Sequence, residues 1–258
     1  MMARVFTKRH GPAVAEDSVR LRILDDVCDQ VDGVVAPDVL HVDEARGCID
    51  YQYMDLSVPF AACLGDQEVA QQLGQVLAAM HAVRPRDLGE LSLDPLPLPL
   101  IGIIGRDAEL LTEALPPGWF HSDFWHGNVF VLANGELAVI DPLPPRFLLP
   151  GQYVLASGAA DVVTMYMSLV AIHPLVRQLT LPLRPRLDSA EAFLDAYLIA
   201  RGVRHGEVAE TIRRSALAFA QIWMEKSVNR LSWPVYKMKR AALARVMREL
   251  NTRGREWK

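Results

Sequence analysis

Two aspartates and an asparagine near the middle of the chain have residue types and spacing that suit phosphoryl transfer. Asp123 lies five residues before Asn128, and Asp141 follows thirteen residues after Asn128. Phosphoryl transfer needs a carboxylate that orients and deprotonates the acceptor hydroxyl, together with hard oxygen ligands for the cation that bridges the phosphates. Asp123 is suited to the first task, and Asn128 with Asp141 to the second. The set therefore predicts a phosphotransfer site that holds a metal ion.

The residues between Asn128 and Asp141 predict a β-hairpin that positions these two side chains. Apolar runs at 129–132 and 137–140 flank Asn134-Gly135, and Asn-Gly between two apolar runs is a strong hairpin signal. Asn128 then stands at the start of one strand and Asp141 at the end of its partner. Because antiparallel pairing puts those two ends side by side, we expect a shared metal site.

The elements ahead of this site predict a small lobe. Short apolar segments bounded by Gly and Pro predict strands, and apolar residues at three- and four-residue spacing predict a helix. The expected order is a strand at 4–9, a helix at 16–27, a loop at 34–37, and strands at 39–42 and 48–54.

The rest of the chain predicts mainly helices, because apolar residues recur there on one face. The expected helices cover 66–83, 107–115 and 159–172, and three more begin near residues 188, 207 and 235. Proline-rich segments at 85–100 and 142–150 predict connecting loops.

Composition places the chain among globular proteins with a substantial core. It has 258 residues, of which 51% are hydrophobic and 22% charged, and its formal net charge is −4. The charge is uneven, since residues 201–258 sum to +9 and the remainder to −13. The basic tail either complements the acidic body or binds an anionic partner; nucleic acid or anionic lipid is the less favoured interpretation.

Cysteine usage and hydropathy predict a cytoplasmic protein without a membrane span. The three cysteines have no Cys-x-x-Cys spacing, so neither a zinc site nor a disulfide framework is indicated. The first eleven residues are too polar for a signal peptide. The longest apolar stretch, around 162–172, is too short to cross a bilayer.

The central motif resembles the aminoglycoside phosphotransferase and choline kinase-like family, which has the protein-kinase fold. The family pattern His-Gly-Asp-x-x-x-x-Asn followed by Ile-Asp is matched by His121-Ser122-Asp123, Asn128 and Ile140-Asp141. The segment 73–81 resembles the helix ahead of the family's catalytic loop. The resemblance implies that Asp123 is the catalytic carboxylate and that Asn128 and Asp141 hold Mg²⁺.

The same resemblance implies roles for residues outside the motif. Lys8 corresponds to the lysine that contacts the nucleotide phosphates. Gln52, Tyr53 and Met54 correspond to the segment between the lobes that bonds the adenine of ATP or another nucleoside triphosphate. Asp161 corresponds to an aspartate that ties the catalytic loop to the helix below it.

The chain departs from the family pattern at three places. Ser122 replaces the usual Gly, and Arg20 stands nearest the position of the family's Glu, with Glu16 or Asp17 as alternative acids for Lys8. Only seven residues precede Lys8, where the family has two strands and a nucleotide-covering turn. This difference predicts an abbreviated N-terminal lobe, a start codon placed too late, or impaired ATP binding.

These observations predict an α+β, two-lobed protein-kinase-like fold. Residues 1–55 would form a reduced nucleotide-binding lobe, and residues 56–258 a catalytic and acceptor-binding lobe. The predicted function is ATP-dependent phosphorylation of a small-molecule hydroxyl, and the alternative is a pseudokinase that binds nucleotide or acts as a scaffold. Pockets for polycationic aminoglycosides need carboxylates, so the basic tail favours a neutral or anionic acceptor.

Overall fold

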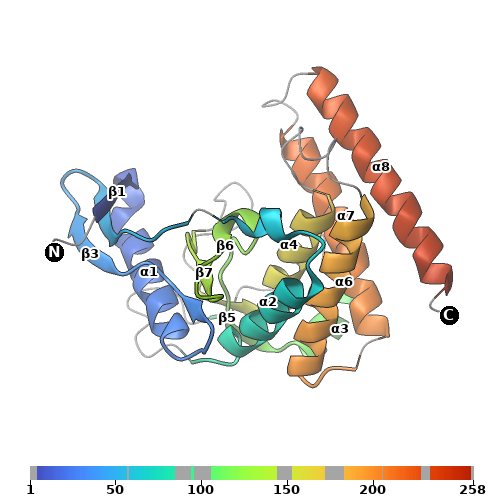
Figure 1. Cartoon of the computed structure of the whole chain (residues 1–258), viewed down its shortest axis with the longest axis horizontal. Coiled ribbons are helices and arrows are strands. Elements are labelled where there is room, and N and C mark those ends of the chain that lie inside the picture. The colour runs from blue at the N-terminus through green and yellow to red at the C-terminus, as the bar shows by residue number, and fades with distance from the viewer. Residues whose placement is uncertain are drawn as a thin grey trace.

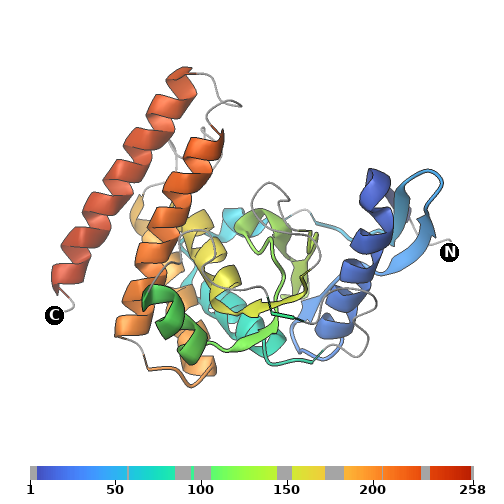
Figure 2. The same ribbon diagram turned by 180° about the vertical axis from the view of Figure 1, so that it is seen from behind.

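The computed structural model describes residues 5–56, 58–84, 94–95, 106–143, 153–171, 183–204, 206–227 and 233–256. Figure 1 shows a small part with strands and one helix at the N-terminal end, a β-hairpin in the middle and helices beyond it. The two ends of the chain lie at opposite ends of the molecule in both views (Figures 1 and 2). The predicted loops at 85–100 and 142–150 lie outside the described residues except at 94–95 and 142–143.

The small part is a three-stranded antiparallel sheet covered by one helix. Its strands are β1 (Val5–Arg9), β4 (Cys48–Gln52) and β3 (Val39–Asp43), in the order β1-β4-β3. After the 3-10 turn η1 (Gly11–Ala13), helix α1 (Val14–Cys28) packs on the sheet. Buried side chains from both elements join in one apolar cluster: Val14, Leu21, Ile49 and Tyr51. The predicted strands and helix are confirmed, although β4 ends two residues before Met54.

A second sheet joins this small part to the middle of the molecule. Strand β2 (Val34–Val35) pairs in parallel with β7 (Leu137–Val139), which pairs antiparallel with β6 (Val129–Val131). The predicted hairpin is therefore confirmed, and its turn uses Gly135 at φ +87°. The predicted loop at 34–37 is wrong at its first two residues, because β7 offers them a strand edge that is distant in sequence. The division into lobes at residue 55 stays a prediction.

Helices make up most of the remainder of the described chain. Their order is η2 (Phe60–Cys63), α2 (Gln67–Met80), α3 (Arg106–Ala114), α4 (Ala159–Val170), α6 (Leu183–Ala200), α7 (Glu207–Ser227) and α8 (Trp233–Glu256). Helix α2 begins after Asp66, whose carboxylate accepts from the backbone N–H groups of Glu68 and Val69 at 3.0 and 3.3 Å. Such a cap satisfies donors that the first helical turn leaves open. Helix α6 begins five residues before the predicted start at 188.

Two further short strands escaped prediction. Strand β5 (Pro117–Trp119) pairs antiparallel with β8 (Leu155–Ser157) directly ahead of the central motif and ahead of α4. Strand β5 contains Pro and Gly, which are depleted in strands. The pairing brings the start of the motif against the start of α4.

Helix α8 packs against α7 and extends away from the rest of the molecule (Figure 2). On α8, Leu243, Val246 and Leu250 are buried, whereas Met238 is 40% exposed. Over the described residues, no helix has both the length and the apolar character needed to cross a membrane.

Gly74 lies where α2 packs against α6, so a larger residue at this position should lower the stability of the fold. A methyl group there would press on the backbone of α6, with the nitrogen of Tyr197 at 2.9 Å. Overpacking costs about 1–3 kcal/mol, and the better helix propensity of Ala offsets about 1 kcal/mol. We expect Gly74→Ala to lower the free energy of unfolding by up to about 2 kcal/mol in urea denaturation.

The matched control is Gln75→Ala, at the neighbouring exposed position of the same helix. This change should stay within about 0.5 kcal/mol of the parent protein. Equal stability of the Gly74 and Gln75 variants would show that α6 moves freely enough to accept the methyl group.

Candidate active site

Residues 120–128 join β5 to the hairpin and carry Asp123. We call this segment the catalytic turn, after the role predicted for Asp123. Its last residues form the 3-10 turn η3 (His126–Asn128). Ser122 adopts φ +73°, in the left-handed region, which costs a residue with a side chain about 1–2 kcal/mol. Contacts around the turn must therefore hold Ser122 in place.

Asp161, at the start of α4, provides two of these contacts. Its buried carboxylate accepts from the backbone N–H groups of His121 at 2.6 Å and Ser122 at 3.0 Å. The Nε2 atom of His81, after α2, lies 3.1 Å from the same carboxylate, and Nδ1 of His81 lies 2.8 Å from the Tyr197 hydroxyl. The turn is thus anchored to three helices. The tie implied for Asp161 is present.

His121 connects the turn to the end of β7. Its Nε2 atom donates to the Ile140 carbonyl at 3.0 Å, and its Nδ1 atom accepts from the Asp123 N–H at 3.3 Å. These two partners require a neutral ring with the proton on Nε2. Burial lowers the pKa of His121 from 6.5 to about 4, which outweighs the raising effects of Asp161, the Ile140 carbonyl and Asp141.

Asn128 brings the predicted base and the predicted metal ligand together. Its Nδ2 atom donates to the Asp123 carbonyl and to the Asp123 carboxylate, both at 3.0 Å, and lies 3.5 Å from the Asp141 carbonyl. The N–H of Ile140 donates to the Asn128 carbonyl at 3.0 Å. The hairpin therefore places Asn128 beside Asp141, as its spacing predicts.

The carboxyl group of Asp123 titrates in an unusual range. Burial raises the pKa of Asp123 from 3.8 to about 7, and the negative charges of Asp141 and Asp161 add to this effect. Hydrogen bonds from the side chains of Asn128 and Trp125 act in the opposite direction. A carboxyl group with a pKa near neutral pH is well matched to accepting a proton from a hydroxyl.

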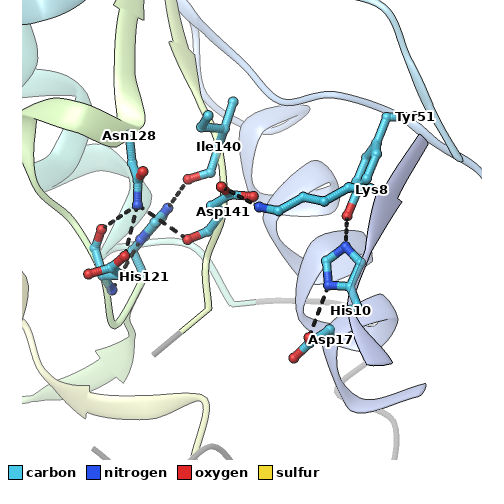
Figure 3. A network of polar contacts seen from close by, with 9 residues as sticks. Lys8, His10, Asp17, Tyr51, His121, Asn128, Ile140 and Asp141 are labelled. Atoms are coloured by element: carbon cyan, nitrogen blue, oxygen red, sulfur yellow. Dashed lines mark hydrogen bonds and ion pairs between the residues drawn. The ribbon is translucent and has the colours of Figure 1, made fainter. Parts of the chain in front are cut away.

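Asp141 also forms an ion pair with the small sheet. It adopts φ +54°, and its Oδ2 atom lies 2.6 Å from Nζ of Lys8. Figure 3 shows the Lys8 side chain extending from β1 to Asp141. Of the two acids considered for Lys8, Asp17 instead lies 3.0 Å from Nδ1 of His10.

The donor atoms at Asn128 and Asp141 fit Mg²⁺. Because Nδ2 of Asn128 faces oxygen atoms, its Oδ1 atom remains to serve as a ligand beside the Asp141 carboxylate. Both are hard oxygen donors, and protein Mg²⁺ sites often use one or two carboxylates with water and substrate phosphates. Within the described ranges, no cluster of three or more His, Cys, Asp or Glu side chains could hold a metal ion.

A cavity of about 660 Å³ lies between the small sheet and Asp141. Lys8, Gln52, Tyr53 and Met54 all contribute to its lining, so the structure brings the four predicted nucleotide-binding residues to one cavity. Its volume lies within the usual range for small-molecule sites. Tyr51 faces the same cavity, and its hydroxyl lies 2.7 Å from Nε2 of His10 (Figure 3).

Arg20 makes contacts at this site that the sequence did not reveal. It is 2% exposed, and its Nη1 atom lies 3.4 Å from the Ser122 hydroxyl. Its Nη2 atom donates to the Tyr153 carbonyl. The available signal was an arginine within the buried face of α1.

Sequence comparison finds no protein-family model and no curated protein that matches the chain. Solved structures do match. Glucosamine kinase has a TM-score of 0.60 at 16% identity, over 97% of this chain and 75% of that one. A choline/ethanolamine kinase family protein from Mesorhizobium loti has a TM-score of 0.54 at 14% identity, over 94% and 81%.

A third match is macrolide 2′-phosphotransferase from Brachybacterium faecium, with a TM-score of 0.53 at 16% identity, over 93% of this chain and 84% of that one. These likenesses confirm the predicted fold: the chain has the two-lobed, protein-kinase-like fold. They support the resemblance to the aminoglycoside phosphotransferase and choline kinase-like family at the level of fold.

The contacts of His121 predict its protonation state. The folded-state pKa of His121 is lowered to about 4. The contribution of its neutral ring to the free energy of unfolding is therefore complete above pH 6.5 and is lost as the pH falls through about 4. Two-bond ¹H–¹⁵N NMR should show a neutral Nε2–H ring between about pH 8 and about pH 5, with free histidine as the titrating reference. A midpoint near that of free histidine would contradict the assigned contacts.

Proposed function

We propose that this protein transfers the terminal phosphoryl group of ATP, or of another nucleoside triphosphate, to the hydroxyl group of a small molecule. The observation that carries the proposal is one connected set of polar groups. The Asn128 amide joins Asp123 to Asp141, and Asp141 in turn bonds Lys8 at the wall of the cavity. Pairwise contacts thus connect the candidate base Asp123, the candidate metal ligands Asn128 and Asp141, and the ammonium group of Lys8.

Asp123 is proposed to orient the acceptor hydroxyl and to accept its proton. Its amide partner Asn128 fixes the direction of the carboxylate, and burial keeps its pKa near neutral pH. Lys8 is proposed to bind the phosphates. Mg²⁺, held by Asn128 Oδ1 and the Asp141 carboxylate, would neutralise charge on the phosphates when bound. Catalysis would then rest on positioning and preorganised charge.

The nucleotide is proposed to occupy the cavity between the small sheet and Asp141. The segment Gln52 to Met54 lines one side, where backbone groups can bond a base, and Lys8 with Asp141 marks the phosphate end. The cavity volume of about 660 Å³ suits a ligand of this size.

The charge distribution favours a neutral or anionic acceptor. Residues 201–258, which contain α7 and α8, carry +9, and a basic region repels a polycation. The structural neighbours are named for glucosamine, choline or ethanolamine, and a macrolide. Because one fold serves such different acceptors, the acceptor has to be found by assay.

A second candidate is a protein that binds nucleotide without transferring phosphate. The specific observation in its favour is the Lys8–Asp141 ion pair. In this pair the group proposed to bind phosphate and the group proposed to bind the metal bind one another. Binding of Mg²⁺–ATP without ADP release from any acceptor would favour this candidate over the enzyme.

The test of the proposed enzyme is an ADP-release screen with Mg²⁺–ATP against sugars, amino alcohols, nucleosides and aminoglycosides. General-base catalysis contributes about 10²- to 10⁴-fold. We therefore expect Asp123→Asn to lower kcat by about 10³-fold while nucleotide binding, measured by calorimetry, is retained. Full activity of Asp123→Asn would refute the assignment of Asp123.

Lys8 gives a separate prediction for the nucleotide. Loss of a charged hydrogen bond costs about 1.5–3 kcal/mol, so Lys8→Met should weaken Mg²⁺–ATP binding about 10- to 100-fold. Arg9→Met is the matched control, because Arg9 is the exposed neighbour on the same strand. Equal dissociation constants for both variants would argue that the phosphates bind elsewhere.

A further inference from the structure

Helix α1 presents a buried arginine to the catalytic turn. Arg20 lies on the inner side of α1 between the buried residues Leu21 and Ser18, and it is 2% exposed. Removing a guanidinium group from water is costly unless its donors are bonded. The contacts that Arg20 makes are therefore a condition of its burial.

Those contacts connect three parts of the chain. From α1, Nη1 lies 3.4 Å from the hydroxyl of Ser122 in the catalytic turn. Nη2 donates to the carbonyl of Tyr153, the residue two before β8. One side chain thus links the helix of the small sheet to the turn and to the segment that leads into α4.

The contact with Ser122 acts at the position where the turn is least favourable. Ser122 has φ +73°, and Asp161 holds its backbone N–H at 3.0 Å. Arg20 reaches the same residue through its hydroxyl. Because Ser122 immediately precedes Asp123, the two contacts together fix the direction in which the chain delivers the Asp123 carboxylate.

Two departures from the family pattern meet in this contact. Ser122 stands where the pattern has Gly, and Arg20 stands nearest the position of its Glu. Lys8 meanwhile pairs with Asp141. Arg20 of α1 is therefore directed to the catalytic turn, and Lys8 has its ion pair with Asp141 of the hairpin.

We propose that Arg20 is a positioning residue of the phosphotransfer site, which holds the catalytic turn through Ser122 and couples that turn to the small sheet that carries Lys8. This inference rests on the proposed function. Arg20 acts through Ser122 and Tyr153 and does not contact the reacting atoms.

The kinetic test compares Arg20→Gln with Arg22→Gln, which removes an exposed arginine two residues away on the same helix. ADP release is measured with Mg²⁺–ATP and the best acceptor of the screen, or with water if no acceptor is found. Small displacements of catalytic groups cost up to about 100-fold. We expect Arg20→Gln to lower kcat about 10- to 100-fold with little change in the KM for ATP, and Arg22→Gln to match the parent.

Ser122→Ala approaches the same contact from the other side, since it removes the hydroxyl and keeps the backbone strain. If Arg20 acts through Ser122, the double variant should have a kcat no lower than that of Arg20→Gln alone. Unchanged kcat in Arg20→Gln, or additive losses in the double variant, would overturn the proposal.

Amide hydrogen exchange tests, independently of activity, whether Arg20 holds the catalytic turn. Peptides that span residues 119–128 should exchange faster in Arg20→Gln than in Arg22→Gln, while peptides from α6 and α7 stay unchanged. Unchanged exchange in the turn, or faster exchange throughout the chain, would overturn the positioning role. If the parent protein releases no ADP, the proposed function fails, and hydrogen exchange still reports whether Arg20 holds the turn.

Discussion

A buried carboxylate needs several donors, and at Asp161 this requirement shapes the centre of the molecule. The group is 1% exposed, so each lone pair that faces no donor would raise the free energy of the folded state. Its donors come from the backbone of His121 and Ser122 and from the ring of His81. Since these residues belong to distant segments, satisfying one carboxylate fixes the catalytic turn against α2 and α4.

The same contacts explain how the site tolerates an unfavourable backbone. Ser122 and Asp141 both have positive φ, and each lies beside a residue that the ring of His121 engages. One ring nitrogen bonds the carbonyl of Ile140 and the other accepts from Asp123. The imidazole of His121 thus connects the backbone next to Ser122 with the backbone next to Asp141. Its neutral state follows because one ring nitrogen must donate and the other must accept.

Local signals in the sequence predicted the elements that depend on neighbouring residues. Asn134-Gly135 predicted the hairpin because its turn geometry is set within a few residues, and the hairpin in turn predicted that Asn128 lies beside Asp141. Contacts between distant segments were less accessible. The β2–β7 pairing, the β5–β8 pairing and the bond from Arg20 to Tyr153 each depend on where the chain returns in space. The exposure of Met238 on α8 was likewise not accessible, since periodicity does not reveal how far a partner helix extends.

The pairing of β2 with β7 has a mechanical consequence. Val34 and Val35 join the small sheet's part of the chain to the hairpin that carries Asn128 and Asp141, and the Leu137 N–H also bonds the Gly33 carbonyl at 2.9 Å. Backbone hydrogen bonds at this seam resist sliding, whereas rotation about it leaves them intact. A rotation of the small sheet about this seam would therefore change the distance between Lys8 and Asp141, and with it the width of the cavity that both residues line.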